Sequence, residues 1–248
     1  MNAWPTALLL AALLPMVRQV RGARAAPMWR GNRFRRFAIG ALWRFGLPVP
    51  VLLVLAGRAS ALVMVPPEFA PVTRLLGLGD RDPWLVGGMV AGALLGMAAA
   101  SGIAAWRAWR GRSPRYWFGE FASLEATDPA DRGWATVLSF VAGLTEEGYF
   151  RLLLPLLAAM ARPGGGGALA GFAGSTALFG FAHRYQGWRG VATTTVVGAG
   201  LTALYLGSGS LALAIGYHAL IDVGSLVVRP WVRQAVRRRK HAKLFSNR

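Results

Sequence analysis

Six ionisable residues lie inside or at the ends of apolar segments in the second half of this 248-residue chain. They are Glu146, Glu147, Arg151, His183, His218 and Asp222. A charged side chain at the centre of a membrane helix costs roughly 2.5–3.5 kcal/mol even on insertion scales. A chain that carries several such groups therefore needs partners for them, a wet cavity, or both. Glutamate and histidine in apolar surroundings are also the groups that acid–base chemistry uses, which makes this set a candidate functional site.

Helical spacing indicates which of these groups can meet. Glu147 and Arg151 are four residues apart, so they share a helix face and can form an ion pair. Glu146 is rotated by about 100° from Glu147 and is expected to face a different neighbour. His218 and Asp222 are again four residues apart, so the carboxylate can hold one imidazole nitrogen and fix the tautomer.

Each group also has a structural interpretation when it is taken alone. An ion pair such as Glu147–Arg151 can simply hold a helix, and His183 can be an interfacial histidine. The His218–Asp222 pair can be a polar clasp between helices. The combination favours function, because three separate helices each offer a Glu or a His in apolar surroundings.

The composition indicates an integral membrane protein. Hydrophobic residues make up 54% of the chain and charged residues 15%, whereas a soluble domain carries about a quarter charged residues.

The net charge of +18 suggests a nucleic-acid partner at first. The arginines, however, cluster beside apolar runs, at 18–36, at 107–115 and in the tail from 229. This is the positive-inside pattern of a membrane protein facing an anionic cytoplasmic leaflet, so no nucleic acid is expected. The lack of Cys excludes disulfides and thiolate metal sites.

We predict an all-α, polytopic transmembrane helix bundle of about six spans. The expected spans are 37–65, 84–106, 134–160, 168–183, 190–207 and 210–228. Arg44 and Arg58 are expected to reach the two interfaces of the first span. The apolar run before these spans, "AWPTALLLAALLPMV", is short for a span. It is a short interfacial or re-entrant helix, an atypical span, or a segment upstream of a true start at Met28, and whether residues 1–27 belong to the mature protein stays open.

The loop charges give an orientation and a division of the chain. The arginine-rich segments fall on alternate sides of the six spans, so both ends of the six-span core are expected to face the cytoplasm, in the cell inner membrane. The predicted parts are an N-terminal apolar and basic segment (1–36), N-terminal spans with a cytoplasmic loop (37–133), a four-helix core (134–228) and a basic cytoplasmic tail (229–248).

Three short motifs lie in order on the polar-bearing helices. "EEGYFR" fits Glu-Glu-x-x-x-Arg, "FGFAH" fits Phe-x-x-x-His, and "HALID" fits His-x-x-x-Asn/Asp. This order resembles the CPBP intramembrane proteases, which include the type II CAAX prenyl endopeptidases and bacteriocin-processing proteins. The resemblance covers about 134–228, and the first 130 residues add nothing to it.

The resemblance implies roles for these residues. Glu146 would be the general base that activates a water molecule, with assistance from His183. His218 would stabilise the oxyanion of the tetrahedral intermediate, while Glu147 and Arg151 would hold the motif helix in place. Peptide hydrolysis needs such a base beside water and such a donor aimed at the developing negative charge.

Asp222 departs from a common form of the family motif, because many members have Asn at this position. An Asn amide can donate a hydrogen bond to an oxyanion, but an ionised Asp cannot. We therefore expect Asp222 to act indirectly, by orienting His218, or else to be protonated.

A metal ion is possible but not favoured. Glu146, His183 and His218 could form a three-ligand zinc site with an open position. The sequence lacks the His-Glu-x-x-His helix of zinc proteases, so a glutamic protease without a cofactor is the preferred interpretation.

The expected substrate is a membrane protein or peptide, either a bacterial peptide precursor or the C-terminal sorting or anchor segment of an exported protein. A prenylated CAAX substrate is less favoured if the chain is bacterial. Two other functions stay open. One is a proton-coupled transporter in which Glu146, His183 and His218 relay protons, and the other is a non-catalytic membrane scaffold or immunity protein.

Overall fold

The computed structural model describes residues 2–22, 32–78, 83–112, 125–126 and 128–246. Within these ranges the regular secondary structure is entirely helical, and no strand is found. The predicted all-α helix bundle is therefore confirmed.

The first part of the chain contains one helix that packs along the bundle, one broken helix, a set of short turns and one long helix. In chain order these are α1 (Ala3–Gly22), α2 (Arg33–Ala41), the π-helical turn η1 (Leu42–Gly46), α3 (Pro48–Leu55), the 3₁₀ turns η2 (Ala59–Leu62) and η3 (Pro67–Phe69), α4 (Ala70–Leu75) and α5 (Pro83–Trp109).

The second part contains four longer rods, two of which are interrupted by a π-helical turn. They are α6 (Pro129–Glu147), η5 (Gly148–Leu153) and α7 (Leu154–Ala161), then α8 (Gly165–Ala182), then the 3₁₀ turn η6 (Arg184–Gln186) with α9 (Gly187–Ser208), and last α10 (Leu211–Val223), η7 (Gly224–Val228) and α11 (Arg229–Ser246).

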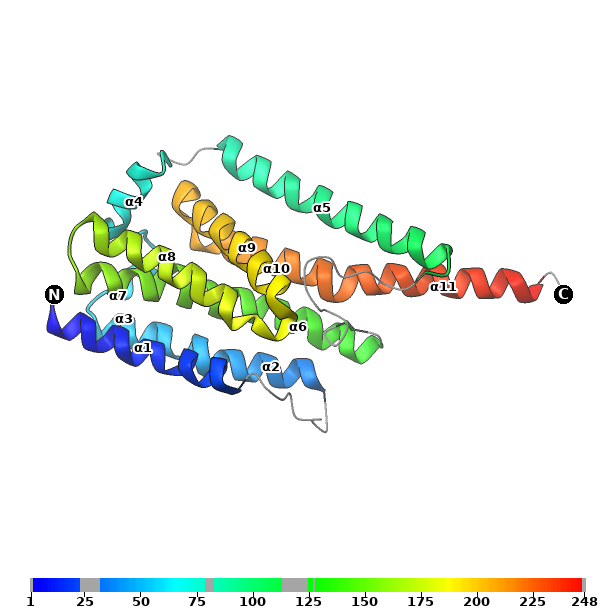
Figure 1. Ribbon diagram of the computed structural model, residues 1–248, viewed down its shortest axis with the longest axis horizontal. Coiled ribbons are helices and arrows are strands. Elements are labelled where there is room, and N and C mark those ends of the chain that lie inside the picture. The colour runs from blue at the N-terminus through cyan, green and yellow to red at the C-terminus, as the bar shows by residue number, and fades with distance from the viewer. Residues whose placement is uncertain (1, 23–31, 79–82, 113–124, 127, 247–248) are drawn as a thin grey trace.

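The helices form an elongated bundle with the two termini at opposite ends (Figure 1). The pairs α7 with α8, α6 with α10, α2 with α6, and α1 with α7 pack against each other, and α5 packs on α11. The helix α7 lies in the middle, and Leu156 and Leu157 are fully buried there. A helix that is apolar on all sides is stable only where neighbours or lipid cover every face, which explains its central place.

Among the described residues, four helical stretches are long and apolar enough to cross a membrane: Arg33–Leu55, Val86–Trp109, Arg184–Ser208 and Leu211–Lys240. The predicted spans 134–160 and 168–183 also form helices, but they do not meet this test of length and composition. The first of them carries two acids and an arginine in its middle, and the second is rich in glycine. The chain is a membrane protein.

The first predicted span has different ends from those expected. The helix begins at Arg33 and ends at Leu55, whereas the predicted range was 37–65. Gly57 follows with a positive φ of 68°, a conformation that costs glycine little and that ends the helix. Arg58, which was expected to reach an interface, lies in this turn and pairs with Glu68. Hydropathy alone did not predict this stop, because the residues after it are also apolar.

The N-terminal apolar run forms a helix that packs along the bundle. Leu8, Ala12 and Met16 are buried and recur at the four-residue spacing of one helix face. The backbone N–H of Asn2 donates to Ala161 O at 2.8 Å, and the Tyr149 hydroxyl donates to Ala12 O. The helix α1 is thus held to the α6–α7 rod by polar contacts as well as by its apolar face.

Two of the π-helical turns meet beside the end of α6. The turns η1 and η5 contact each other, and η5 follows directly after Glu147. Gly46 at the end of η1 lies so close to α6 that a Cβ there would come within 2.9 Å of the Thr145 side chain. Isolated π-helical turns inside α-helices are frequent at functional sites, because the extra residue re-aims the side chains around it.

Candidate active site

The structure brings the six predicted residues together from three rods. Glu146 and Glu147 end α6, and Arg151 lies one turn later in η5. His183 is the C-cap residue of α8, and His218 and Asp222 lie on α10. The close packing of α6 against α10 and of α8 against η5 explains how residues far apart in the chain come into contact.

Glu147 is the centre of a buried inner layer. Its Oε1 lies 2.7 Å from Nδ1 of His218, and its Oε2 lies 3.2 Å from Nε of Arg151. The side chains of Glu147 and Arg151 are both 0% exposed, and that of His218 is 7% exposed. A buried carboxylate between an arginine and an imidazole is compensated from two sides, which lowers the cost of removing it from water.

The Arg151 guanidinium lies over the aromatic ring of Phe179, 4.2 Å from its centroid. This contact supplies a cation–π interaction in a dry environment. Gly198 on α9 makes room for it, because a Cβ there would lie 2.9 Å from the Phe179 ring and 3.1 Å from Nη2 of Arg151. The close approach of α9 therefore depends on a glycine at this position.

Glu146 forms an outer layer with the two histidines. Its Oε2 lies 4.0 Å from Nε2 of His183 and 4.0 Å from Nε2 of His218. Nδ1 of His183 lies 2.8 Å from the carbonyl oxygen of Phe179, which can only accept. Nδ1 of His183 therefore carries a proton, and its Nε2 is the nitrogen that faces Glu146. A contact at Nδ1 orients each imidazole, and both rings direct Nε2 toward the same oxygen of Glu146.

Asp222 lies beside His218 but is farther from the imidazole nitrogens than Glu147 is. Its Oδ2 is 3.6 Å from Nε2 of His218, whereas Glu147 is 2.7 Å from Nδ1. The contact across helices, from α6 to α10, thus orients the imidazole more closely than the four-residue contact that the spacing predicted. The Asp222 side chain is 30% exposed, against 15% for Glu146 and for His183. Exposure therefore rises from the inner layer to the outer rim.

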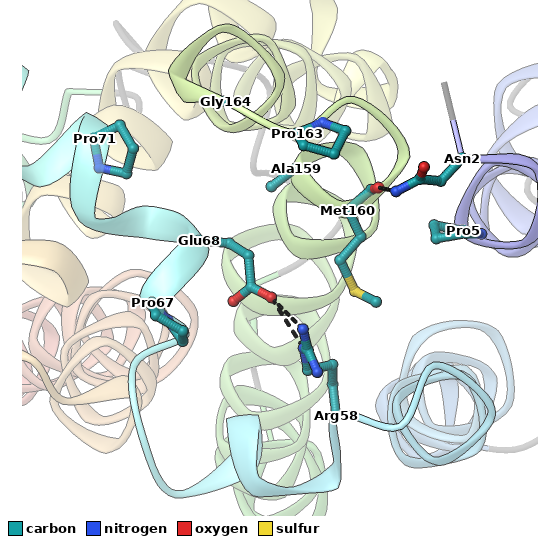
Figure 2. A pocket seen from close by; sticks show the side chains of 10 residues that line it. All are labelled: Asn2, Pro5, Arg58, Pro67, Glu68, Pro71, Ala159, Met160, Pro163 and Gly164. Atoms are coloured by element: carbon teal, nitrogen blue, oxygen red, sulfur yellow. Dashed lines mark hydrogen bonds and ion pairs between the residues drawn. The ribbon is translucent and has the colours of Figure 1, made fainter.

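A cavity of about 310 Å³ lies elsewhere, near the N-terminal end of α8, whereas His183 is at its C-terminal end. Figure 2 shows the side chains that line this cavity. Arg58 and Glu68 pair at its wall, with Nη2 2.7 Å from Oε1. The other lining residues are Asn2, Pro5, Pro67, Pro71, Ala159, Met160, Pro163 and Gly164. None of the six predicted residues lines it, so the shared wet pocket expected around them stays a prediction.

Residues 129–224 match the family model of the type II CAAX prenyl endopeptidase Rce1-like proteins. The family resemblance predicted from the three motifs is thereby confirmed for this region. A search of curated proteins found no match, and neither did a search of solved structures. The Rce1-like region begins at the start of α6 and ends at Gly224, close to the predicted core of 134–228, and contains all six site residues. This match supports a membrane protease, a hydrolase that acts on a membrane protein or peptide.

The three predicted zinc ligands of the Rce1-like region, Glu146, His183 and His218, lie near one another, and whether they bind zinc stays a prediction. Tetrahedral ligands at zinc distances lie roughly 3.3–3.4 Å from one another. Each histidine Nε2 is 4.0 Å from Glu146 Oε2. Among the described residues, no three His, Cys, Asp or Glu side chains have the spacing of a metal site.

Sequence reasoning missed several residues around the site of the Rce1-like region. Gly198 carries no chemical group, and only the packing of α9 shows its importance. Tyr185 and Gln186 follow His183 in the turn η6, where the Tyr185 ring lies 5.8 Å from the His183 ring. An aromatic and an amide two and three residues after a motif histidine were the only signal in the sequence, and that signal is weak.

Proposed function

We propose that the Rce1-like region is an intramembrane endopeptidase that hydrolyses a peptide bond with a water molecule activated by Glu146. One observation carries the proposal. Imidazole nitrogens from two other helices, Nε2 of His183 and Nε2 of His218, both face the same oxygen of Glu146 at 4.0 Å. A carboxylate and two imidazoles that converge in this way can supply the base and the hydrogen-bond donor that hydrolysis of an amide uses.

Glu146 and His183 can share a water molecule. Because Nδ1 of His183 donates to Phe179 O, its Nε2 has a lone pair that accepts a hydrogen bond. The carboxylate of Glu146 accepts a second hydrogen bond from the same water molecule. Water held in this way has both of its protons directed to protein acceptors and a lone pair free to attack a carbonyl carbon.

His218 can stabilise the negative charge that develops on the substrate oxygen. Three carboxylates surround its ring, namely Glu147 at 2.7 Å, Asp222 at 3.6 Å and Glu146 at 4.0 Å. In the doubly protonated imidazolium, Nδ1 donates to Glu147 and Nε2 keeps a proton to donate. That Nε2 proton is the donor for the oxyanion.

The proposed reaction balances without a cofactor. Glu146 takes one proton from water as the oxygen of water bonds to the scissile carbonyl carbon, and the carbonyl oxygen becomes the oxyanion. Glu146 then gives that proton to the nitrogen of the leaving amine as the carbon–nitrogen bond breaks. The products are a carboxylic acid and an amine. Glu147 and Arg151 do not touch the substrate in this scheme and instead hold His218 and the end of α6.

We propose a glutamic rather than a metal-dependent protease. Cleavage by the purified protein should therefore survive exhaustive treatment with a chelator, measured as the initial rate before and after treatment. Loss of the rate on chelation, followed by its recovery on addition of zinc, would contradict this assignment.

The proposed orientation places the α11 end of the bundle in the cytoplasm. Basic residues of α11 reach the end of α5 there, since Arg237 donates to Arg112 O at 3.4 Å and Lys240 donates to Trp109 O at 2.9 Å. A cluster of cations beside apolar helices fits the anionic inner leaflet of a cell inner membrane. The substrate we propose is a peptide precursor, or the C-terminal anchor segment of a membrane-associated protein.

The test uses the full chain in proteoliposomes and two probes, an unprenylated peptide with a C-terminal anchor segment and a farnesylated CAAX peptide. Wild type is compared with Glu146→Gln and His183→Ala by mass spectrometry of the products. The expected result is a cut product from at least one probe with wild type, and a loss of about 10²–10⁴-fold in rate in the variants. The matched control is Glu68→Gln, which removes a carboxylate at the distant cavity and should cleave at the wild-type rate.

The same vesicles separate the other two functions. Proton flux that depends on Glu146, with no cut product from either probe, would indicate a transporter. Neither flux nor cleavage would indicate a non-catalytic protein.

A further inference from the structure

The turn that follows His183 is tightly held beside the site. Gln186 N donates to His183 O at 2.9 Å, which closes the turn η6. The Gln186 side chain is buried, and Gly190 one turn later leaves the space that it fills. The turn η6 can therefore keep its side chains at fixed distances from His183.

Tyr185 projects from this turn toward the catalytic groups. Its ring centroid lies 5.8 Å from that of His183, and its hydroxyl oxygen accepts a hydrogen bond from Gln186 Nε2 at 3.2 Å. The Tyr185 side chain is half exposed, so it forms part of the open rim of the site and not of the buried layer.

The hydrogen-bond roles leave the hydroxyl of Tyr185 with a proton to give. A phenol has one donor and can accept as well. Since the Gln186 amide nitrogen only donates, the Tyr185 oxygen is the acceptor in their contact, and its own proton is directed elsewhere. Gln186 therefore acts as a positioning residue for that proton.

The oxyanion has one clear donor among the six site residues, and it needs more. Preorganised sites for tetrahedral intermediates commonly present two or more donors to the same oxygen. His218 supplies one through Nε2. Asp222 is next to it, at 3.6 Å, but an ionised carboxylate has no proton to donate.

We propose that the hydroxyl group of Tyr185 is the second oxyanion donor, a role in which it touches the reacting carbonyl of the substrate. This inference rests on the proposed function, because it assigns a residue to that reaction. It predicts a loss in kcat and not in KM, since the hydrogen bond strengthens only as charge develops on the oxygen.

The first test compares Tyr185→Phe with wild type in the proteoliposome assay. Removal of one oxyanion donor is expected to lower kcat about 10²–10³-fold, with KM unchanged. The control is Tyr205→Phe, which removes a buried hydroxyl that forms no hydrogen bond with a described residue, and which should keep the wild-type kcat. An unchanged kcat in Tyr185→Phe overturns the inference, and so does a raised KM with an unchanged kcat.

The second test asks whether Tyr185 provides what Asp222 lacks. Asp222→Asn places an amide donor beside His218. In that background, Tyr185→Phe should lower kcat by less than about tenfold, because a donor is already present. An equal loss in both backgrounds overturns the inference.

Glu146→Gln keeps this inference separate from the proposed function. If Glu146→Gln is inactive and Tyr185→Phe cleaves like wild type, only the role of Tyr185 fails. If wild type cleaves neither probe, or if Glu146→Gln cleaves as wild type does, the proposed function itself fails.

Discussion

Two buried glutamates of this chain face arginines, and their surroundings differ. Glu147 and Arg151 are fully buried in the middle of the bundle. Glu125 is also buried, but it lies just before α6, and Arg233 and Arg229 of α11 reach it with side chains that are 12% and 20% exposed. The first pair holds a residue of the site, and the second ties the segment just before the Rce1-like region to the C-terminal helix.

The two groups also differ in how well the charges are satisfied. Arg233 binds Glu125 with both terminal nitrogens, a bidentate geometry, and Arg33 donates to the Glu125 backbone oxygen at 2.8 Å. The guanidinium nitrogens of Arg151 form no hydrogen bond with a described residue, and Glu147 Oε2 is likewise without one. A poorly satisfied pair is retained where Glu147 also orients His218. Local rules of stability are broken most often at functional sites, which supports different roles for the two glutamates.

The largest expected effect comes from removing the charge of each glutamate in turn. Glu147→Gln leaves Arg151 buried without a counterion and should lower the free energy of unfolding by about 3–5 kcal/mol. Glu125→Gln should cost about 1–2 kcal/mol, because its arginines can reach water. Thermal unfolding in detergent measures both. Equal losses of unfolding free energy in the two variants would contradict the different roles of the two glutamates.

The double variant Glu147→Gln/Arg151→Met sharpens this comparison. Removing both partners of a buried pair is often nearly neutral, so it should recover most of the lost stability. Cleavage should stay low, since His218 no longer has a carboxylate on Nδ1. Recovery of cleavage together with stability would show that the pair is only structural.

A smaller effect is expected from two glycines on α9. Gly198→Ala would push on Phe179 and Arg151, and overpacking of this kind costs about 1–3 kcal/mol. Gly200→Ala is the matched control, since its Cβ would lie 3.7 Å from Met89, an ordinary contact, and alanine favours a helix. The midpoint of thermal unfolding should fall for the first variant and hold or rise for the second. A fall of equal size in both would indicate that the contact with Phe179 and Arg151 does not decide the result.

The residues of the candidate site could be named from the sequence, but the contacts between them across helices could not be predicted. Ionisable residues in apolar helices are rare enough to be informative one by one, and a four-residue spacing correctly paired Glu147 with Arg151. Spacing within one helix says nothing about distances between helices. The 2.7 Å contact from Glu147 on α6 to His218 on α10 therefore had no counterpart in the prediction.

The helix ends show the same limit. Hydropathy extended the first span to 65, whereas the chain stops the helix with Gly57 in a left-handed conformation. The π-helical turn η5 beside Glu147 also left no clear mark in the sequence, because its residues are ordinary for a buried helix. Both features depend on backbone geometry that the packing of neighbouring helices selects.

The smallest expected effect tests whether the charge of Asp222 matters. Asp222→Asn removes a charge 3.6 Å from His218, which weakens the imidazolium, but it adds an amide that can donate to the oxyanion. These changes oppose each other, so kcat/KM should stay within about tenfold of wild type. Asp222→Ala removes the charge without adding a donor and should lose more. A folded Asp222→Asn protein that does not cleave would mean that the carboxylate charge itself keeps His218 protonated, and that Asp222 belongs with Glu147 as a partner of the imidazolium.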